Sequence, residues 1–380
     1  MIVYYLISIA LALGSFFNKR WMYWLFILLG CVFLTIAPST NFDYEAYKNA
    51  YDNAYVMDGY PWFTSQTYLD AEPLFMAYIA FWKVSTGFPF SYFLAINFTL
   101  CVALSAFFLR KTFAEVKYDW WLMLMPVIYP TLFYWSPRSS ISFVFLFGSF
   151  ILFCKKKYIG ALSLLIFSFL MHSQFLLFAS LLLLSAIVMH RKGSVRIGGY
   201  GLWWMISSVA LFIALRYMPI FADRIASWLS FLPSAAIISS KMGYFEGLEE
   251  TFSGFRLTAL LSTFLYPMLC FYLLQRKKVL GGELNLLFSD ETQDRYFINL
   301  LFSIVLYGAV INLAFWGNPH VAGRLSRFSD YVGMGLLIPL FMHTYFQNRL
   351  FLSILLVFFC ILTPFLYPTL YTNVDWSILL

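Results

Sequence analysis

The sequence is dominated by long runs of apolar residues, each bounded by charged side chains or by Pro and Gly clusters. The runs are about 16–22 residues long, the length that an α-helix needs to cross the hydrocarbon core of a bilayer. Residues 176–184 are apolar without alternation, whereas the strands of a membrane β-barrel alternate apolar and polar side chains. Only 11% of the residues are charged, far fewer than in a soluble domain. The sequence therefore predicts an all-α polytopic membrane protein.

Basic clusters separate the apolar runs, at Lys19-Arg20, Arg110-Lys111, Lys155-Lys156-Lys157, Arg191-Lys192 and Arg276-Lys277-Lys278. The positive-inside rule places such clusters in the cytoplasm. This assignment predicts about twelve transmembrane helices, within a range of 11–14, and both chain termini on the outer side. The predicted spans are residues 2–17, 21–38, 89–109, 120–137, 139–154, 158–171, 174–189, 199–217, 254–274, 296–316, 326–346 and 350–367.

Two of the outer loops are long, at residues 39–88 and 218–253, and no soluble domain interrupts the chain. Residues 1–380 are therefore expected to form a single membrane domain. Within the first loop, residues 71–84 form an apolar segment that is short for a full crossing. We predict a helix that lies at the outer surface or re-enters the membrane there, and a short tilted thirteenth span is the alternative.

Tyrosines recur at helical spacing in the first outer loop, at Tyr44, Tyr47, Tyr51 and Tyr55. Such a stripe is typical of a helix at a membrane interface, where the ring is apolar and the hydroxyl group is wet. The same stripe would also suit stacking against sugar rings, so the pattern leaves both interpretations open.

Three polar residues lie at the predicted outer ends of apolar helices: Glu72, Arg138 and His172. Glu72 precedes a proline, where its carboxylate can cap the helix or take a proton from a sugar hydroxyl. Arg138 begins a helix, the end at which the helix dipole disfavours a cation, so it needs an anion or membrane headgroups as a partner. His172 is either an interfacial residue satisfied by a neighbour or part of a site.

A polar turn is predicted on the outer side at residues 317–330, and it carries two arginines on the side where positive-inside sorting does not place them. Arg324 and Arg327 are three residues apart and would share one face of a helix. Guanidinium groups bind phosphate oxygens in bidentate fashion, so the pair could hold a diphosphate, with Lys241 from the second long loop. Anchoring to headgroups, or pairing with Asp330, is the alternative.

Several classes of protein are not expected. The sequence has no GxxxxGK[ST], GxSxG or HExxH motif, and its five cysteines lie inside apolar runs without metal-ligand spacing. No basic patch stands apart from the membrane flanks, so nucleic acid is not an expected partner. A transporter built from repeats would show two similar halves, which the sequence lacks.

The order of the motifs resembles that of the EpsG-like and Wzy-type polysaccharide polymerases of bacterial envelopes, over about residues 39–340. The matching positions are Asp43-Tyr44 with Tyr47, Glu72-Pro73-Leu74-Phe75, Arg138, His172-Ser173, Lys241 with Tyr244, and Arg324 and Arg327 with Tyr331.

The resemblance implies a glycosyltransferase that needs no metal or other cofactor and works at the outer face of the bacterial cytoplasmic membrane. It also implies a GT-C-like architecture. The donor is a growing glycan on undecaprenyl diphosphate and the acceptor is a repeat unit on the same lipid. The product would be an O-antigen, a capsule or an exopolysaccharide, and a chain-length regulator would be an optional partner.

The resemblance also implies roles for individual residues. Glu72 is the expected base, with Asp43 as the second choice and His172 beside them in the catalytic set. The expected diphosphate contacts are Arg138, Arg324, Arg327 and Lys241, and the expected glycan contacts are Tyr44, Tyr47, Tyr244 and Tyr331. Two alternatives stay open: a flippase or other transporter of lipid-linked oligosaccharides, and a ligase or single-sugar glycosyltransferase that uses the same carrier. Cations clustered at one face favour transfer over transport.

Overall fold

The computed structural model describes residues 20–36, 42–57, 60–62, 72–112, 136–172, 175–191, 200–228, 268–269, 272, 291–316, 319–332 and 354. Its elements, in chain order, are α2 (Arg20–Ile36), α3 (Phe42–Asp52), β1 (Tyr55–Met57), β2 (Tyr60–Trp62), α4 (Pro73–Thr86), α5 (Phe90–Thr112), α7 (Pro137–Cys154), α8 (Tyr158–Met171), α9 (Leu176–Arg191), α10 (Gly201–Trp228), α14 (Glu291–Ala314) and α15 (Pro319–Val332). The described part of the chain is therefore helical apart from one small hairpin.

The helices belong to two compact units. The first unit holds α2 to α8 with the hairpin, and the second holds α9, α10, α14 and α15. Glu72, Arg138 and His172 all belong to the first unit. Whether residues 1–380 act as a single membrane domain stays a prediction.

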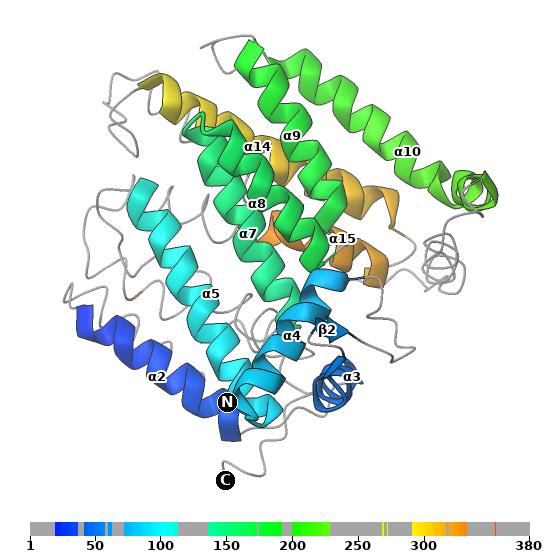
Figure 1. Ribbon diagram of the computed structural model, residues 1–380. Helices are drawn as coiled ribbons and strands as arrows, with labels where there is room; N and C mark the ends of the chain where they lie inside the picture. Colours follow the sequence, from blue (N-terminus) through cyan, green and yellow to red (C-terminus); the bar gives the residue numbers. More distant parts are fainter. Residues whose placement is uncertain are drawn as a thin grey trace. The chain divides into compact units, whose positions relative to one another are not determined.

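Helices α7 and α8 form an antiparallel helical hairpin in the first unit (Figure 1). A tight turn joins them, in which Lys156 adopts the left-handed region with φ 57°. Buried serines tie the two helices together: Ser142 Oγ donates to the carbonyl of Ser168 at 2.7 Å, and Ser168 Oγ donates to the carbonyl of Ser142 at 2.9 Å. The hairpin therefore brings the start of α7 and the end of α8 to the same end of the helix pair.

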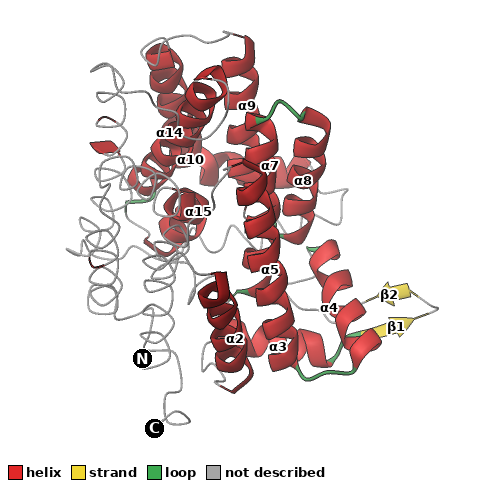
Figure 2. Cartoon of the chain, turned by 90° about the vertical axis from the view of Figure 1, so that its left-hand side faces the viewer, coloured by secondary structure: helices red, strands yellow, loops and turns green. Residues whose placement is uncertain are grey.

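Helix α4 ends in a turn that leads directly into α5. Gly87 has φ 66° and donates its N–H to the carbonyl of Lys83 at 2.9 Å, which terminates α4 in the usual left-handed way. Figure 2 shows α4 running obliquely to α5, with the β1–β2 hairpin beyond it. This turn lets the first residue of α4 lie away from α5 and near the α7–α8 pair.

Asn97 on α5 connects three helices of the first unit. Its side chain is buried, accepts a hydrogen bond from the Tyr78 hydroxyl of α4 at 3.2 Å, and donates to the Pro137 carbonyl at 3.3 Å. It also donates to Ser140 Oγ at 2.8 Å. Buried polar groups in an apolar helix bundle need such partners, and here the partners fix the start of α7.

The tyrosine stripe of the first outer loop forms a helix as far as Tyr51. Tyr44, Tyr47 and Tyr51 are all buried on α3, and the Tyr51 hydroxyl donates to the carbonyl of Phe88 at 3.0 Å. The expectation that Tyr55 continues this helical stripe was wrong. Helix α3 ends at Asp52, and Tyr55 begins strand β1, where it lies opposite Trp62 of β2.

Helix α14 is the central helix of the second unit, in contact with α9, α10 and α15. The Tyr307 hydroxyl of α14 donates to Ser207 Oγ of α10 at 3.1 Å and lies 3.0 Å from Ser185 Oγ of α9. Gly308 packs directly against the side chain of Ser329 on α15, because a Cβ at position 308 would collide with it. Small and hydroxyl side chains thus hold this unit together, as is common between membrane helices.

The expected polar turn at residues 317–330 is mostly helical. Pro319–Val332 form α15, whose buried face includes Ser326, Phe328 and Ser329. Pro at the first helical position explains the start of the helix. The polar turn was therefore the wrong assignment for this segment, and the predicted span 326–346 begins inside α15.

The described helices have the lengths and composition of a membrane protein. Three are long and apolar enough to cross a bilayer: Phe90–Phe108, Pro137–Cys154 and Tyr296–Ala314. Shorter apolar helices are Leu74–Thr86, Tyr158–Met171, Leu176–Met189 and Gly201–Tyr217. Large apolar side chains are exposed along α10, as lipid contact requires: Leu202, Met205, Ile206, Val209, Phe212 and Ile213.

Seven predicted spans coincide with described helices, namely 21–38, 89–109, 139–154, 158–171, 174–189, 199–217 and 296–316. The span predicted at 2–17 lies outside the described residues, and so does the greater part of the spans predicted at 120–137, 254–274, 326–346 and 350–367. The number of twelve helices and the GT-C-like architecture therefore stay predictions. Residues 71–84 are helical from Pro73, as expected, and their placement relative to the bilayer also stays a prediction.

Candidate active site

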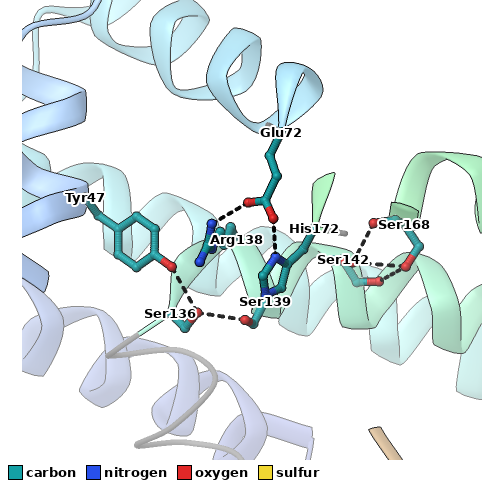
Figure 3. A network of polar contacts seen from close by, with 8 residues as sticks. All are labelled: Tyr47, Glu72, Ser136, Arg138, Ser139, Ser142, Ser168 and His172. Atoms are coloured by element: carbon teal, nitrogen blue, oxygen red, sulfur yellow. Dashed lines mark hydrogen bonds and ion pairs between the residues drawn. The ribbon is translucent and has the colours of Figure 1, made fainter. Parts of the chain in front are cut away.

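Glu72 occupies the N-cap position of α4, directly before Pro73. Its side chain is 1% exposed and makes no capping hydrogen bond to the helix. The carboxylate instead points toward α7 and α8, as Figure 3 shows. The sequence offered helix capping as the structural explanation of this glutamate. In the structure its carboxylate instead connects α4 to α7 and α8.

Arg138 is the second residue of α7 and reaches the Glu72 carboxylate. Its Nη1 donates to Glu72 Oε2 at 2.6 Å, and its side chain is 13% exposed. This ion pair explains why a cation is tolerated at the positive end of a helix dipole. A charge-assisted contact of this length, shielded from water, is among the stronger polar interactions in proteins.

His172 approaches the same carboxylate from the end of α8. It is the C-cap residue of α8, donating its backbone N–H to the carbonyl of Ser168 at 3.0 Å. Its Nδ1 lies 2.6 Å from Glu72 Oε1, and its side chain is 6% exposed. The two oxygens of one buried carboxylate are thus engaged by a guanidinium and by an imidazole.

The antiparallel arrangement of α7 and α8 explains why the three residues meet. Arg138 begins α7 and His172 follows the end of α8, so both lie at the end of the helical hairpin away from the turn at Lys156. The oblique path of α4 brings Glu72 to that end (Figure 3). We call Glu72, Arg138 and His172 the carboxylate cluster.

A second layer of side chains supports Arg138. The guanidinium carbon lies 5.4 Å from the centre of the Tyr47 ring, a cation–π distance. The Tyr47 hydroxyl is 3.4 Å from Ser136 Oγ, which lies 2.7 Å from Ser139 Oγ. Phe75 packs edge-on against Tyr47 at 5.9 Å between ring centres. The predicted glycan contact Tyr47 is therefore also part of the packing that orients the arginine.

Two further residues predicted for the site, Tyr44 and Asp43, lie on α3. Tyr44 is 6% exposed and packs edge-on against Phe90 at 5.3 Å, so the structure places it in the interior. Burial, followed by the charges of Glu45 and Asp52, raises the pKa of Tyr44. Asp43 lies on α3, and its side chain is outside the described part of the structure.

The predicted diphosphate contacts of the second half lie on α15 or outside the described residues. Arg324 and Arg327 are both half-buried on α15, within the second unit. Tyr331 belongs to the same helix, but its side chain is not among those described. Lys241 and Tyr244 lie outside the described residues.

The described residues contain no group of three or more His, Cys, Asp or Glu side chains placed to hold a metal ion. The fixed positive charge of the carboxylate cluster comes from Arg138.

Sequence reasoning found the members of the cluster but not the residues that hold it. Asn97, Ser136 and Ser139 were not singled out as site residues. A polar side chain at span depth was the available signal for Asn97, because such a group needs a partner on another helix. Ser136 and Ser139 carried no signal of their own.

No curated protein and no solved structure shows significant similarity to the chain. The sequence model of the EpsG family matches residues 20–374, nearly the whole chain. That match includes every residue of the carboxylate cluster and of its supporting layer. The chain therefore belongs to the EpsG family.

Proposed function

We propose that this protein polymerises undecaprenyl-diphosphate-linked oligosaccharide repeat units by metal-independent glycosyl transfer at the outer face of the bacterial cytoplasmic membrane. The observation that carries the proposal is the buried carboxylate cluster of Glu72, Arg138 and His172 in a helical membrane protein of the EpsG family. Buried ionisable groups in a membrane protein are costly, and a functional site is their usual explanation.

The proposed reaction needs a proton acceptor and a source of positive charge. The acceptor hydroxyl must lose its proton as it attacks the anomeric carbon of the donor glycan, and the cluster offers a carboxylate and an imidazole for that task. The leaving diphosphate gains negative charge, which fixed cations stabilise best in a site of low dielectric constant. The cluster therefore fits the part of the reaction in which the hydroxyl group of the acceptor sugar loses its proton.

We assign the leaving diphosphate to Arg324, Arg327 and Lys241, together with Arg138 of the carboxylate cluster. Arg138 already holds Glu72, so much of its charge is balanced within the cluster. Arg324 and Arg327 lie three residues apart on α15 and are partly exposed, as contacts with a lipid diphosphate require. Of the predicted glycan contacts, Tyr244 and Tyr331 keep that role in the proposal, whereas Tyr44 and Tyr47 are buried on α3 and are assigned to packing.

The position of the cluster supports an outer-face site. The turn between α7 and α8 is the basic segment Lys155-Lys156-Lys157, which the positive-inside rule places in the cytoplasm. The cluster lies at the other end of the same two helices. On this topology it faces the side of the membrane where lipid-linked repeat units are presented after translocation.

The test is reconstitution of the purified protein in vesicles with lipid-linked repeat units, extracted from cells that make the glycan but lack this gene. We expect a ladder of glycans that differ by one repeat unit, resolved by gel electrophoresis. Protein-free vesicles are the control. Movement of intact repeat units between leaflets without any ladder would contradict the proposal and favour a flippase. Transfer of a single unit without a ladder would favour a ligase.

A further inference from the structure

The geometry points to His172 as the residue that accepts the proton of the acceptor hydroxyl, through Nε2, with Glu72 as the positioning residue that holds its ring. This inference rests on the proposed function, because it assigns roles within the transfer reaction. It departs from the simplest assignment, in which the carboxylate of Glu72 is itself the base.

The surroundings of Glu72 argue against its acting as the base. Its Oε2 accepts a hydrogen bond from Arg138 at 2.6 Å, and its Oε1 lies 2.6 Å from His172 Nδ1. A carboxylate that accepts from two donors, one of them permanently charged, is a poor proton acceptor, because protonation would break a strong contact.

The same contact fixes the proton on the imidazole ring. An ionised carboxylate is an acceptor only, so the ring atom that faces it, Nδ1, carries the hydrogen. In the neutral ring Nε2 then holds the lone pair and is the basic atom. Glu72 thereby selects the tautomer that carries its hydrogen on Nδ1. The basic nitrogen is then Nε2, on the side of the ring away from Glu72.

The charges around His172 favour the cation that forms when Nε2 takes a proton. Glu72 stays ionised beside Nδ1 and offsets the new positive charge. His172 also follows the last residue of α8, and the C-terminal end of a helix dipole favours a cation. Arg138 is paired with the other oxygen of the same carboxylate, which balances part of its positive charge.

In the proposed step the hydroxyl group of the acceptor sugar passes its proton to His172 Nε2. The oxygen lone pair forms the new bond to the anomeric carbon of the donor. The bond from that carbon to the diphosphate oxygen breaks, and its electron pair leaves with undecaprenyl diphosphate. The imidazolium then returns its proton to water, which restores the neutral ring for the next unit.

The experiment uses the full chain in vesicles with the lipid-linked repeat units described above. His172→Ala should lower the turnover rate by about 10²–10⁴-fold, the usual contribution of a positioned base. Added imidazole should restore part of the activity, and more basic methylimidazoles should restore more of it. His172→Gln is the second variant, since its amide N–H can still donate to Glu72 but no basic nitrogen remains. We expect it to fold and to be inactive.

Glu72 is tested by a readout that a purely structural residue would not change. Glu72→Gln should lower kcat with little change in KM, and it should shift to lower pH the rise of rate that deprotonation of the imidazole produces in the wild type. Glu72→Asp should recover part of kcat. Ser149→Ala is the matched control, because Ser149 also makes a buried hydrogen bond between α7 and α8, to Ala161 at 2.7 Å. It should keep the wild-type pH profile.

Two results separate this inference from the proposed function. Restoration of a Glu72→Ala variant by formate, with no response of His172→Ala to imidazole, would overturn the assignment and make Glu72 the base. The same holds if His172→Gln polymerises at a rate within tenfold of the wild type. Failure of the wild-type protein to form any ladder would instead remove the proposed function itself.

Discussion

Glu72 and His172 are one hundred residues apart in the sequence, yet Glu72 Oε1 lies 2.6 Å from His172 Nδ1 in a buried site. The contact joins the start of α4 to the end of α8, and Arg138 at the start of α7 completes it. Three helix ends thus share one carboxylate. A substitution at any one of the three residues should therefore change the interactions of the other two.

Removing Arg138 should leave the buried Glu72 carboxylate without its permanent counter-charge. Breaking a buried pair in this way costs about 3–5 kcal/mol, so Arg138→Met should lower the thermal unfolding midpoint in detergent. The double variant Arg138→Met with Glu72→Gln should recover much of that loss, because no buried charge is then left unpaired. A double variant as unstable as the sum of the two single changes would contradict a direct interaction.

Asn97→Leu should disturb the start of α7 without changing any charge. It leaves the Tyr78 hydroxyl and the Pro137 carbonyl without this partner, at about 1–3 kcal/mol for each buried group left unsatisfied. The resulting shift of the carboxylate cluster should lower the polymerisation rate by about tenfold to a hundredfold. Asn312→Leu is the control, since Asn312 donates to the carbonyl of Gly308 in its own helix. Equal losses in both variants would show that Asn97 does not position the site.

Gly308→Ala should weaken the packing of α14 against α15. The added methyl group would meet the side chain of Ser329, and overpacking of this kind costs about 1–3 kcal/mol. A second change, Ser329→Gly, should restore part of the stability. Gly323→Ala is the matched control, because nothing lies within 4 Å of a Cβ there. It should be neutral or stabilising by up to about 1 kcal/mol in unfolding measurements.

Arg327→Ala should abolish chain growth while leaving folding and membrane insertion unchanged, because Arg327 is assigned to the leaving diphosphate. Gel analysis of the glycan and the amount of inserted protein are the two measurements. Arg216, exposed on α10, provides the matched control, and Arg216→Ala should keep normal chain length. Normal chain length in the Arg327→Ala variant would remove the diphosphate role from this residue.

Cysteine labelling tests the side of the membrane on which the cluster lies. In a cysteine-free background, Lys83→Cys on α4 should react with an impermeant maleimide added outside the cell. Lys156→Cys, at the opposite end of the α7–α8 pair, should react only after the membrane is opened. Labelling of Lys83→Cys only from the cytoplasm would show that α4 does not lie at the outer surface.

The local structure was largely predictable from the sequence, because apolar periodicity and helix-end residues determine it. The structure gives α8 as Tyr158–Met171, the bounds predicted for the span 158–171. Glu72, Arg138 and His172 could be selected because each is a polar group at the end of an apolar helix. Their shared contact could not be predicted, since it depends on the oblique path of α4 beside α8.

Two local features were missed although the sequence carried a signal for each. The dipeptide Asp58-Gly59 is a sequence that favours two-residue hairpin turns, and it predicts the paired strands that contain Tyr55 and Trp62. Pro319 fits the first position of a helix and predicts the start of α15. The burial of Tyr47 carried no such signal, because the spacing of the tyrosines is the same whether the stripe faces sugars or the protein core.

The central claim is that each elongation step transfers the glycan and releases its lipid carrier. The most direct measurement counts released undecaprenyl diphosphate against new glycosidic bonds in vesicles that contain only this protein and lipid-linked repeat units. We expect one carrier released for each bond formed, at a rate that falls in the His172→Gln and Glu72→Gln variants. Repeat units that cross the bilayer with no carrier released would contradict it.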